Sequence, residues 1–555
     1  MVRKNHEKTI ATLILACLAS TTIFIAPWSV THPYSIPKLI PLISFSFSLL
    51  PLIFLIIFSN KSKIVQYKRI LILILAHLLS SIVVLIYAKN NLTQELYGVW
   101  GRNNGFLTQI SYIILITASI FYPTKKYLNT FIKTSISIGI ISLIYGILQY
   151  LKLVKIANIN GENTQSSGFY GNENFYTALI GLISVLCLSS TLGKKLRKLS
   201  DFIPVLFIIF GLLGIHLANS QQGYLVFAVG SIIVLLVYIK TSKYTKLVIP
   251  YIILSSTTLL LIILGFLQIG PLAKYVYQET LTFRGYYWQA GIKMFLHNPI
   301  TGLGFDSYRD YYRRFRSPDS LSRLAPTDIA DSAHNYLIDT AVNGGILLLL
   351  TYLLLIIYVM FCTVQIIRKM NKFEAPVVAV VAAWYAFTTQ SIISLPQLGL
   401  TIWGWIISGL IIAIYKQGGQ EITGLTYSIS VKTPYKIMGV LFLLGLTISV
   451  LPFKTSSEYR RAQETQDVSV LIHAANMYPQ DATMLAATGG ALIRINYFKE
   501  ASTILDISIS KYPQYYESWY IYSQLPTLSE KEKSLANRKM VELEPLLISN
   551  STISK

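Results

Sequence analysis

The sequence contains thirteen apolar runs. Each is close in length to the 17 to 25 residues that a helix needs to cross a bilayer. Because backbone polar groups in lipid must pair within the segment, such runs are expected to be helical. The sequence therefore predicts an all-α, polytopic membrane helix bundle of about 12 or 13 spans. The shorter runs, such as 400–415, leave open a re-entrant segment. The runs fall at 10–27, 38–59, 70–88, 106–122, 131–151, 175–192, 202–218, 223–239, 247–268, 343–367, 375–395, 400–415 and 435–452.

The distribution of charge predicts the orientation of these spans. Only 13% of the 555 residues are charged, about half the share in soluble domains, and the net charge is +22. With the N-terminus inside, the first five inner segments hold 17 basic residues and the intervening outer loops hold 4. This asymmetry obeys the positive-inside rule, so the basic residues set topology and no nucleic-acid partner is expected. We predict a multi-pass protein of the cytoplasmic (plasma or inner) membrane, with an uncleaved first helix.

Two polar segments interrupt the spans and divide the chain. We expect N-terminal transmembrane helices over 1–268, an external loop over 269–342, C-terminal transmembrane helices over 343–452 and an external tail over 453–555. The loop mixes aromatic and basic residues and is expected to fold over the membrane surface. Both polar segments are predicted to lie on the non-cytoplasmic side, among membrane lipids.

The tail contains a repeat. Tyr478-Pro479 and Tyr512-Pro513 are 34 residues apart, and Leu485, Gly489 and Ala501 between them fit the tetratricopeptide pattern. Two good units and one degenerate unit are expected, in a helical stack of a kind that often holds a protein partner. An irregular helical tail is the alternative.

Polar residues gather at the predicted outer ends of the spans, where charge near lipid usually has a function. Amide, hydroxyl and guanidinium groups beside glycines suit a site for sugar or phosphate. Asn172 and Asn174 fit helix caps equally well, and the arginines after residue 308 fit a surface that faces lipid headgroups. The predicted substrate-binding residues are Arg102, Asn172, Asn174, Ser220, Gln221, Arg309, Arg313 and Asn335.

The elements around the large loop resemble a known signature. Arg284 and Trp288 are followed by His297-Asn298-Pro299-Ile300-Thr301-Gly302-Leu303-Gly304, then by His334-Asn335-Tyr336-Leu337, and finally by Gly344-Gly345-Ile346. In this order and topology they resemble the O-antigen ligase and Wzy-type polymerase superfamily, which also contains the protein O-oligosaccharyltransferases. The similarity covers about residues 95 to 415.

The resemblance implies a GT-C-like membrane glycosyltransferase that takes a polyprenyl-diphosphate-linked glycan as donor, without a metal or another cofactor. By resemblance, His334 is the general base for the acceptor hydroxyl and Arg284 is a diphosphate ligand. Imidazole titrates near neutrality and can accept a hydroxyl proton, and a guanidinium group stays charged and can hydrogen-bond two phosphate oxygens at once. Both residue types therefore suit these roles. The acceptor is left open among a lipid, a polysaccharide and a protein.

One departure and two alternatives remain. The family often has Ser-Arg where this chain has Ser220-Gln221, so Arg102 or an arginine of the 309–323 cluster is expected to supply the missing cation. His334 also fits a helix-capping role at the interface. Instead of an enzyme, the chain could be a glycolipid transporter or flippase, or a non-catalytic scaffold; the charges avoid the span centres, which favours chemistry at one surface.

Overall fold

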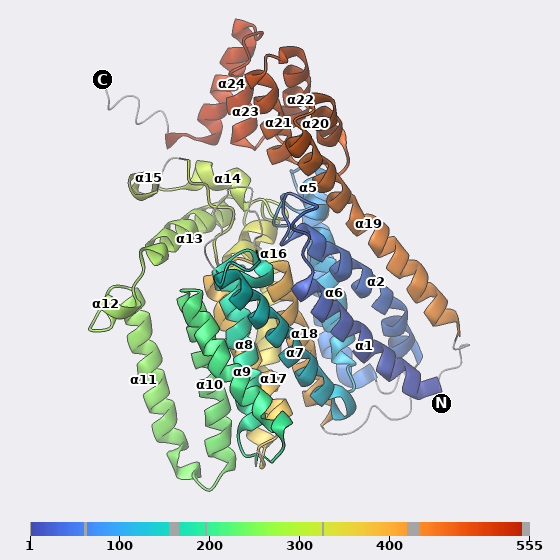
Figure 1. The fold of residues 1–555 in the computed structure, drawn as a ribbon, viewed down its shortest axis with the longest axis vertical. Helices are drawn as coiled ribbons and strands as arrows, with labels where there is room; N and C mark the ends of the chain where they lie inside the picture. The colour runs from blue at the N-terminus through green and yellow to red at the C-terminus, as the bar shows by residue number, and fades with distance from the viewer. Residues whose placement is uncertain are drawn as a thin grey trace.

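The computed structural model of the chain describes residues 2–59, 64–154, 166–194, 197–324, 327–418 and 432–546, and every regular element in these ranges is a helix (Figure 1). Eleven of the described helices are long and apolar enough to cross a membrane. The prediction of a polytopic helical bundle is confirmed. Two further predicted runs fall on α1, which is 22 residues long but is not among the eleven, and on the shorter α6. The thirteen helices are α1 (Val2–Ile23), α2 (Ile36–Ser59), α4 (Lys68–Tyr87), α6 (Phe106–Ile120), α7 (Thr124–Tyr150), α8 (Glu173–Thr191), α9 (Leu199–Leu217), α10 (Gln221–Thr241), α11 (Val248–Phe266), α16 (Tyr336–Lys369), α17 (Ala375–Ile393), α18 (Leu398–Gln417) and α19 (Lys432–Thr465).

Each of the thirteen predicted runs falls on one of these helices. The run at 400–415, for which a re-entrant segment was the alternative, is the 20-residue helix α18. It is the most enclosed of the eleven spans, with 89% of its apolar window buried by other helices. At the other extreme α11 is not buried at all and stands at the edge of the bundle in Figure 1. Burial by protein, which hydropathy does not report, separates these two spans.

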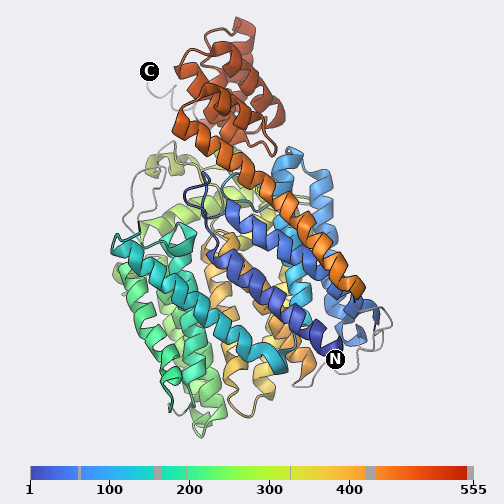
Figure 2. The same cartoon turned by 45° about the vertical axis from the view of Figure 1, so that its right-hand side comes forward.

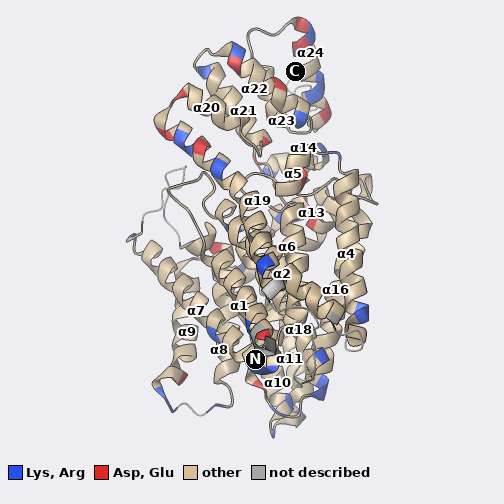
Figure 3. Ribbon diagram, turned by 90° about the vertical axis from the view of Figure 1, so that its right-hand side faces the viewer, with Lys and Arg blue, Asp and Glu red and all other residues tan. Residues whose placement is uncertain are grey.

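The polar segments collect at one end of the bundle. The loop helices α12 (Ala273–Val276), α13 (Glu279–His297), α14 (Tyr308–Phe315) and α15 (Pro318–Arg323) lie between the spans and the C-terminal helices, and the N-terminus lies at the opposite end (Figure 1). The short α5 (Leu92–Tyr97) lies at the same end as the loop. Figure 3 shows few charged residues along the spans and many on the C-terminal helices. The segments predicted to be external thus share one face.

Two helices cross the predicted domain boundaries. Helix α16 begins at Tyr336, seven residues before the run at 343, and is bent at Gly345, whose φ is +59°. Helix α19 continues past 452 to Thr465, so the last span and the start of the C-terminal region form one helix (Figure 2). Hydropathy did not predict these helical turns, because the residues at both junctions are polar.

The C-terminal domain, which we define as residues 466–546, contains five helices after α19. They are α20 (Val468–Asn476), α21 (Ala482–Arg494), α22 (Phe498–Lys511), α23 (Tyr516–Tyr522) and α24 (Glu530–Leu543). Leu485 and Ala501 of the proposed repeat are fully buried in their common core. A Cβ on Gly489 would lie 2.5 Å from Leu505, so these helices approach closely there. The helical nature of the tail agrees with the prediction, while its assignment to the tetratricopeptide family stays a prediction.

Candidate functional site

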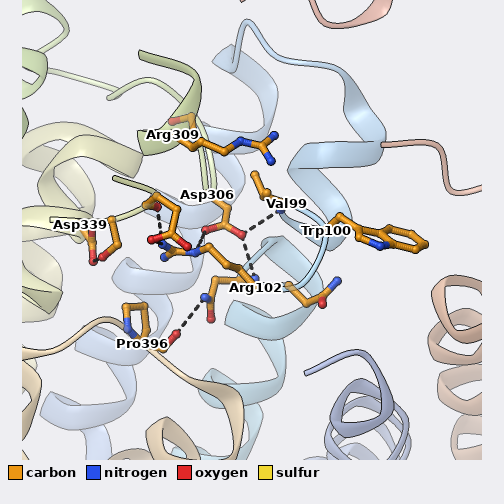
Figure 4. A network of polar contacts seen from close by, with 12 residues as sticks. Val99, Trp100, Arg102, Asp306, Arg309, Asp339 and Pro396 are labelled. Carbon is orange, nitrogen blue, oxygen red and sulfur yellow. Dashed lines mark hydrogen bonds and ion pairs between the residues drawn. The ribbon is translucent and has the colours of Figure 1, made fainter. Parts of the chain in front are cut away.

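A buried ion pair joins the α5–α6 loop to the large loop. Arg102 Nε lies 3.1 Å from Asp306 Oδ1, and the second oxygen of Asp306 accepts hydrogen bonds from the backbone N–H groups of Val99 at 2.9 Å and Asn104 at 3.3 Å (Figure 4). Asp306 raises the pKa of Arg102 above its ordinary value, against the effect of burial. The pair therefore stays charged and fixes the two loops to each other.

The chain between α5 and α6 folds tightly enough to wrap this carboxylate. Gly98 has φ +77°, in the left-handed region that favours glycine. A Cβ at this position would lie 2.7 Å from Asp306 Oδ2 and 2.6 Å from the amide nitrogen of Asn104. The glycine-rich stretch around Arg102 that the sequence singled out thus forms a carboxylate-binding turn.

A second carboxylate, Asp339, orders the segment that precedes α16. It accepts hydrogen bonds from Ser332 Oγ at 2.6 Å and from the Ala333 N–H at 2.8 Å, and the His334 N–H in turn donates to Ser332 Oγ at 2.9 Å. His334 has φ +53°, a conformation that non-glycine residues adopt rarely and that is often found at functional sites. The network compensates this backbone strain and holds the imidazole in one place.

The imidazole of His334 is half-buried against the loop helix α13. Its ring stacks on Tyr287, with centroids 5.6 Å apart and planes at 30°. Burial, together with the nearby Arg284 and Arg102, lowers the pKa of His334 to about 4, although Asp331 opposes the shift. His334 is therefore neutral at physiological pH and can accept a proton. The helix cap that was the alternative role for His334 is supplied by Asn335, whose Oδ1 accepts the N–H groups of Leu337 and Ile338.

Arg284 lies one turn before Tyr287 on α13 and is half-buried. Burial lowers the pKa of Arg284 from its ordinary value. Within the described ranges, Arg284 has neither an ion pair nor a hydrogen bond, in contrast to Arg102, Arg309 and Arg313. Arg284 and His334 are close enough to influence each other electrostatically. A half-buried guanidinium with no carboxylate partner among the described residues, beside a neutral imidazole, is suited to hold an anionic group.

A cavity of about 560 Å³ lies next to Arg102 and Asp331. It has the size typical of ligand pockets. Asp331 is three residues from His334 along the chain, but neither His334 nor Arg284 is among the described residues that line the cavity. The other walls come from the α1–α2 loop, the α5–α6 loop, the segment before α8 and its first turn, the α17–α18 loop and α19. Their residues are Thr31, His32, Pro33, Tyr34, Ser35, Gly101, Tyr170, Gly171, Phe175, Leu395, Pro396, Gln397 and Arg460.

Most of the residues that line the cavity were not predicted from the sequence. Tyr34, His32 and Gln397 lie in short loops between apolar runs and carry no recognisable motif, so only the packing of the helices brings them together. Tyr170 and Tyr287 were likewise not predicted to belong to the site. Aromatic rings and amide groups of this kind are suited to contacts with a sugar.

Four of the predicted substrate-binding residues act within the fold as caps and their partners. Asn172 caps α8, Ser220 caps α10, and Asn335 caps α16, each through a side-chain oxygen that accepts backbone N–H groups. Ser220 Oγ also donates to Asn174 Oδ1 at 2.8 Å, which ties α8 to α10. Gln221 is exposed at the start of α10. None of these five lines the cavity of the described chain, and their role as ligands stays a prediction.

The two other predicted ligands, Arg309 and Arg313, face the C-terminal domain. Arg309 Nη1 donates to Thr483 Oγ1 at 2.6 Å, and Arg313 pairs with Glu517 at 2.8 Å and with Glu544. The partners of these two arginines are therefore residues of the C-terminal domain. Lipid headgroups, the alternative partners considered from the sequence, are not needed to account for their charge. Of the eight predicted substrate-binding residues, Arg102 is the one that lines the cavity in the described part of the chain.

The described residues contain no group of three or more His, Cys, Asp or Glu side chains able to hold a metal ion. The three cysteines are buried and free.

Residues 206–353 match the family model described as O-antigen ligase. Over this segment, 148 of its 555 residues, the chain is similar to the O-antigen ligase family. No curated protein matches the chain. The matched segment runs from α9 into α16 and contains Arg284, Asp306, Asp331 and His334. Arg102 and the C-terminal domain lie outside it. The similarity supports a membrane enzyme of the glycosyltransferase type.

Proposed function

We propose that the protein transfers a glycan from a polyprenyl diphosphate to an acceptor hydroxyl on the non-cytoplasmic face of the membrane. The observation that carries the proposal is Arg284, which has no ion pair within the described ranges, beside the neutral His334, three residues from Asp331 in the cavity wall. The similarity of residues 206–353 to the O-antigen ligase family supports the general reaction class. The acceptor is a lipid, a polysaccharide or a protein.

The geometry supports a division of roles between the two residues. Arg284 binds the diphosphate, because a guanidinium matches phosphate oxygens in pairs and no protein carboxylate in the described ranges competes for it. His334 accepts the proton of the acceptor hydroxyl as the oxygen attacks the anomeric carbon. The bond from that carbon to the phosphate oxygen breaks, and the diphosphate leaves with the bonding electrons. Positive charge from Arg284 stabilises this leaving group, which makes metal-independent transfer chemically feasible.

Arg102 supplies the second cation of the site. Its charge is shared with Asp306 and Asp331, which lie at 3.1 and 3.2 Å, so it is less suited than Arg284 to bind a diphosphate on its own. Its position in the cavity wall favours orientation of the glycan or its phosphate through the remaining donors. We propose that Arg102 takes the role of the arginine that the family often has in its Ser-Arg motif and that this chain lacks.

The orientation proposed here places the cavity outside. The basic residues of alternate loops predict an inner N-terminus, and the loop helices and the C-terminal domain share the end opposite to the N-terminus (Figure 1). The polyprenyl chain of the donor would then lie in the outer leaflet beside the spans.

The test is a transfer assay with purified protein in liposomes, a polyprenyl-diphosphate glycan and a cell-envelope extract as acceptor. We expect His334→Ala and Arg284→Gln to lose transfer while the protein remains folded and inserted. His297→Gln is the matched control, because His297 ends α13 and packs against Phe315 rather than Tyr287. Full activity in His334→Ala would contradict its role as the base. Translocation of the glycolipid without transfer would identify a flippase instead.

A further inference from the structure

The C-terminal domain contacts the Arg102 loop directly. Asp481 Oδ2 accepts a hydrogen bond from the backbone N–H of Trp100 at 3.1 Å, two residues before Arg102. The ring of Trp100 packs in an apolar cluster with Tyr459, Ala474 and Met484, and its Nε1 donates to Thr31 Oγ1 at 3.2 Å. Figure 4 shows Trp100 directed away from Arg102. The loop that carries Arg102 is thus anchored in the helices beyond the last span.

The same domain also binds α14, the helix that begins two residues after Asp306. Three residues after Asp306, Arg309 begins a series of contacts from α14 to the C-terminal domain: its guanidinium donates to Thr483 and lies over the ring of Tyr515. Arg313 and Arg316 both pair with Glu544, which is fully buried. Buried carboxylates that lack partners are costly, so Glu544 and its two arginines hold each other in place.

These two sets of contacts converge on Arg102 and Asp306. Asp481 caps α21 through its other oxygen, Oδ1, which accepts the N–H groups of Thr483 and Met484. One end of α21 therefore reaches the Arg102 loop through Asp481 and reaches α14 through Thr483. The two loops that form the ion pair are fixed to the same helix end.

We propose that the C-terminal domain is a fixed part of the active site, in which Asp481 and Glu544 are positioning residues that set the distance between Arg102 and Asp306. This inference rests on the proposed function of the cavity. It differs from the view of the tail as a separate module that recruits acceptors, because it assigns the domain a role in the use of the donor itself.

The sharpest test replaces Asp481 with Asn. An Asn at this position keeps an oxygen for the α21 cap, since Asn caps helices as well as Asp, but its amide nitrogen cannot accept the Trp100 N–H. Asp467→Asn is the matched control: Asp467 caps α20 through Oδ1 in the same way and is exposed. Both variants should insert and fold, and Asp481→Asn should melt slightly below the unmodified protein because it loses the bond to Trp100.

We expect Asp481→Asn to lower kcat/KM for the glycan donor by about tenfold, the size of effect that loss of one charge-assisted hydrogen bond produces. The KM for the acceptor should not change, and Asp467→Asn should leave both unchanged. Unaltered donor kcat/KM in Asp481→Asn would overturn the inference, whether or not the acceptor KM moves. Absence of transfer by the unmodified protein would instead overturn the proposed function.

A second test uses the opposite side of the domain. Glu544→Gln should also lower donor kcat/KM, whereas Glu530→Gln, on an exposed residue of α24 that pairs with Lys533, should not. Equal activities of Glu544→Gln and Glu530→Gln would argue against a positioning role.

Discussion

Replacement of Asp306 by Asn is expected to destabilise the protein strongly. The side chains of Arg102 and Asp306 are 9% and 2% exposed, so the substitution removes a charge from a buried pair and leaves a buried guanidinium. Such losses cost about 3 to 5 kcal/mol of unfolding free energy. Asp331 remains 3.2 Å from Arg102 and compensates part of the charge, so we expect a value near the lower limit, about 3 kcal/mol.

Asp331→Asn is the matched comparison, because it removes the other carboxylate from the same arginine. The side chain of Asp331 is 41% exposed, and exposed pairs contribute about 1 kcal/mol or less. Reversible unfolding in mixed micelles, followed by tryptophan fluorescence, would measure both differences. Equal losses in the two variants, or an Asp306→Asn protein as stable as the unmodified one, would refute the assignment of a buried, charged pair.

Three further outcomes are expected. The lowered pKa of His334, about 4, keeps the imidazole neutral as the pH falls from 8 to 5.5, so kcat/KM should stay flat there and decline only as the pH approaches 4; a decline centred on 6.5 would contradict the shift. Gly345→Ala should prevent correct folding, measured by detergent-extracted yield, because a Cβ would collide with the carbonyl group of Ile300 at a positive φ, whereas Gly285→Ala, in open space within α13, should be tolerated. A cysteine at the exposed Ser322 should react with a membrane-impermeant thiol reagent in intact cells over a low background, since the native cysteines are buried, and protection would reverse the proposed orientation.

The sequence predicted the helices better than it predicted their ends. Hydropathy located the eleven candidate spans of the described chain, together with α1 and α6, because a bilayer demands long apolar runs. Hydropathy did not predict that α16 begins at Tyr336 or that α19 continues to Thr465. Where a helix leaves the membrane its residues become polar, and a hydropathy profile cannot distinguish a polar helix from a polar loop. The cap at Asn172 was one of two roles that the sequence offered, because capping is local. The cap at Asn335 was not predicted.

The site was predictable only in part. His334 and Arg284 came from a family resemblance, and the structure brings them together. Arg309 and Arg313 were assigned to substrate because arginines in an external loop have no visible partner in the sequence. Their partners, Thr483, Glu517 and Glu544, lie about 170 to 230 residues away along the chain, a separation that no local pattern can reveal.

The uninterrupted α19 has a consequence for the C-terminal domain. Its 34 residues give a length of about 50 Å at 1.5 Å per residue, whereas the hydrocarbon core of a bilayer is about 30 Å thick. A single helix therefore crosses the lipid and still extends beyond it. Because α19 is continuous and the domain also bonds to Trp100 and Arg309, the domain is held both by a rigid helix and by the loops that it covers.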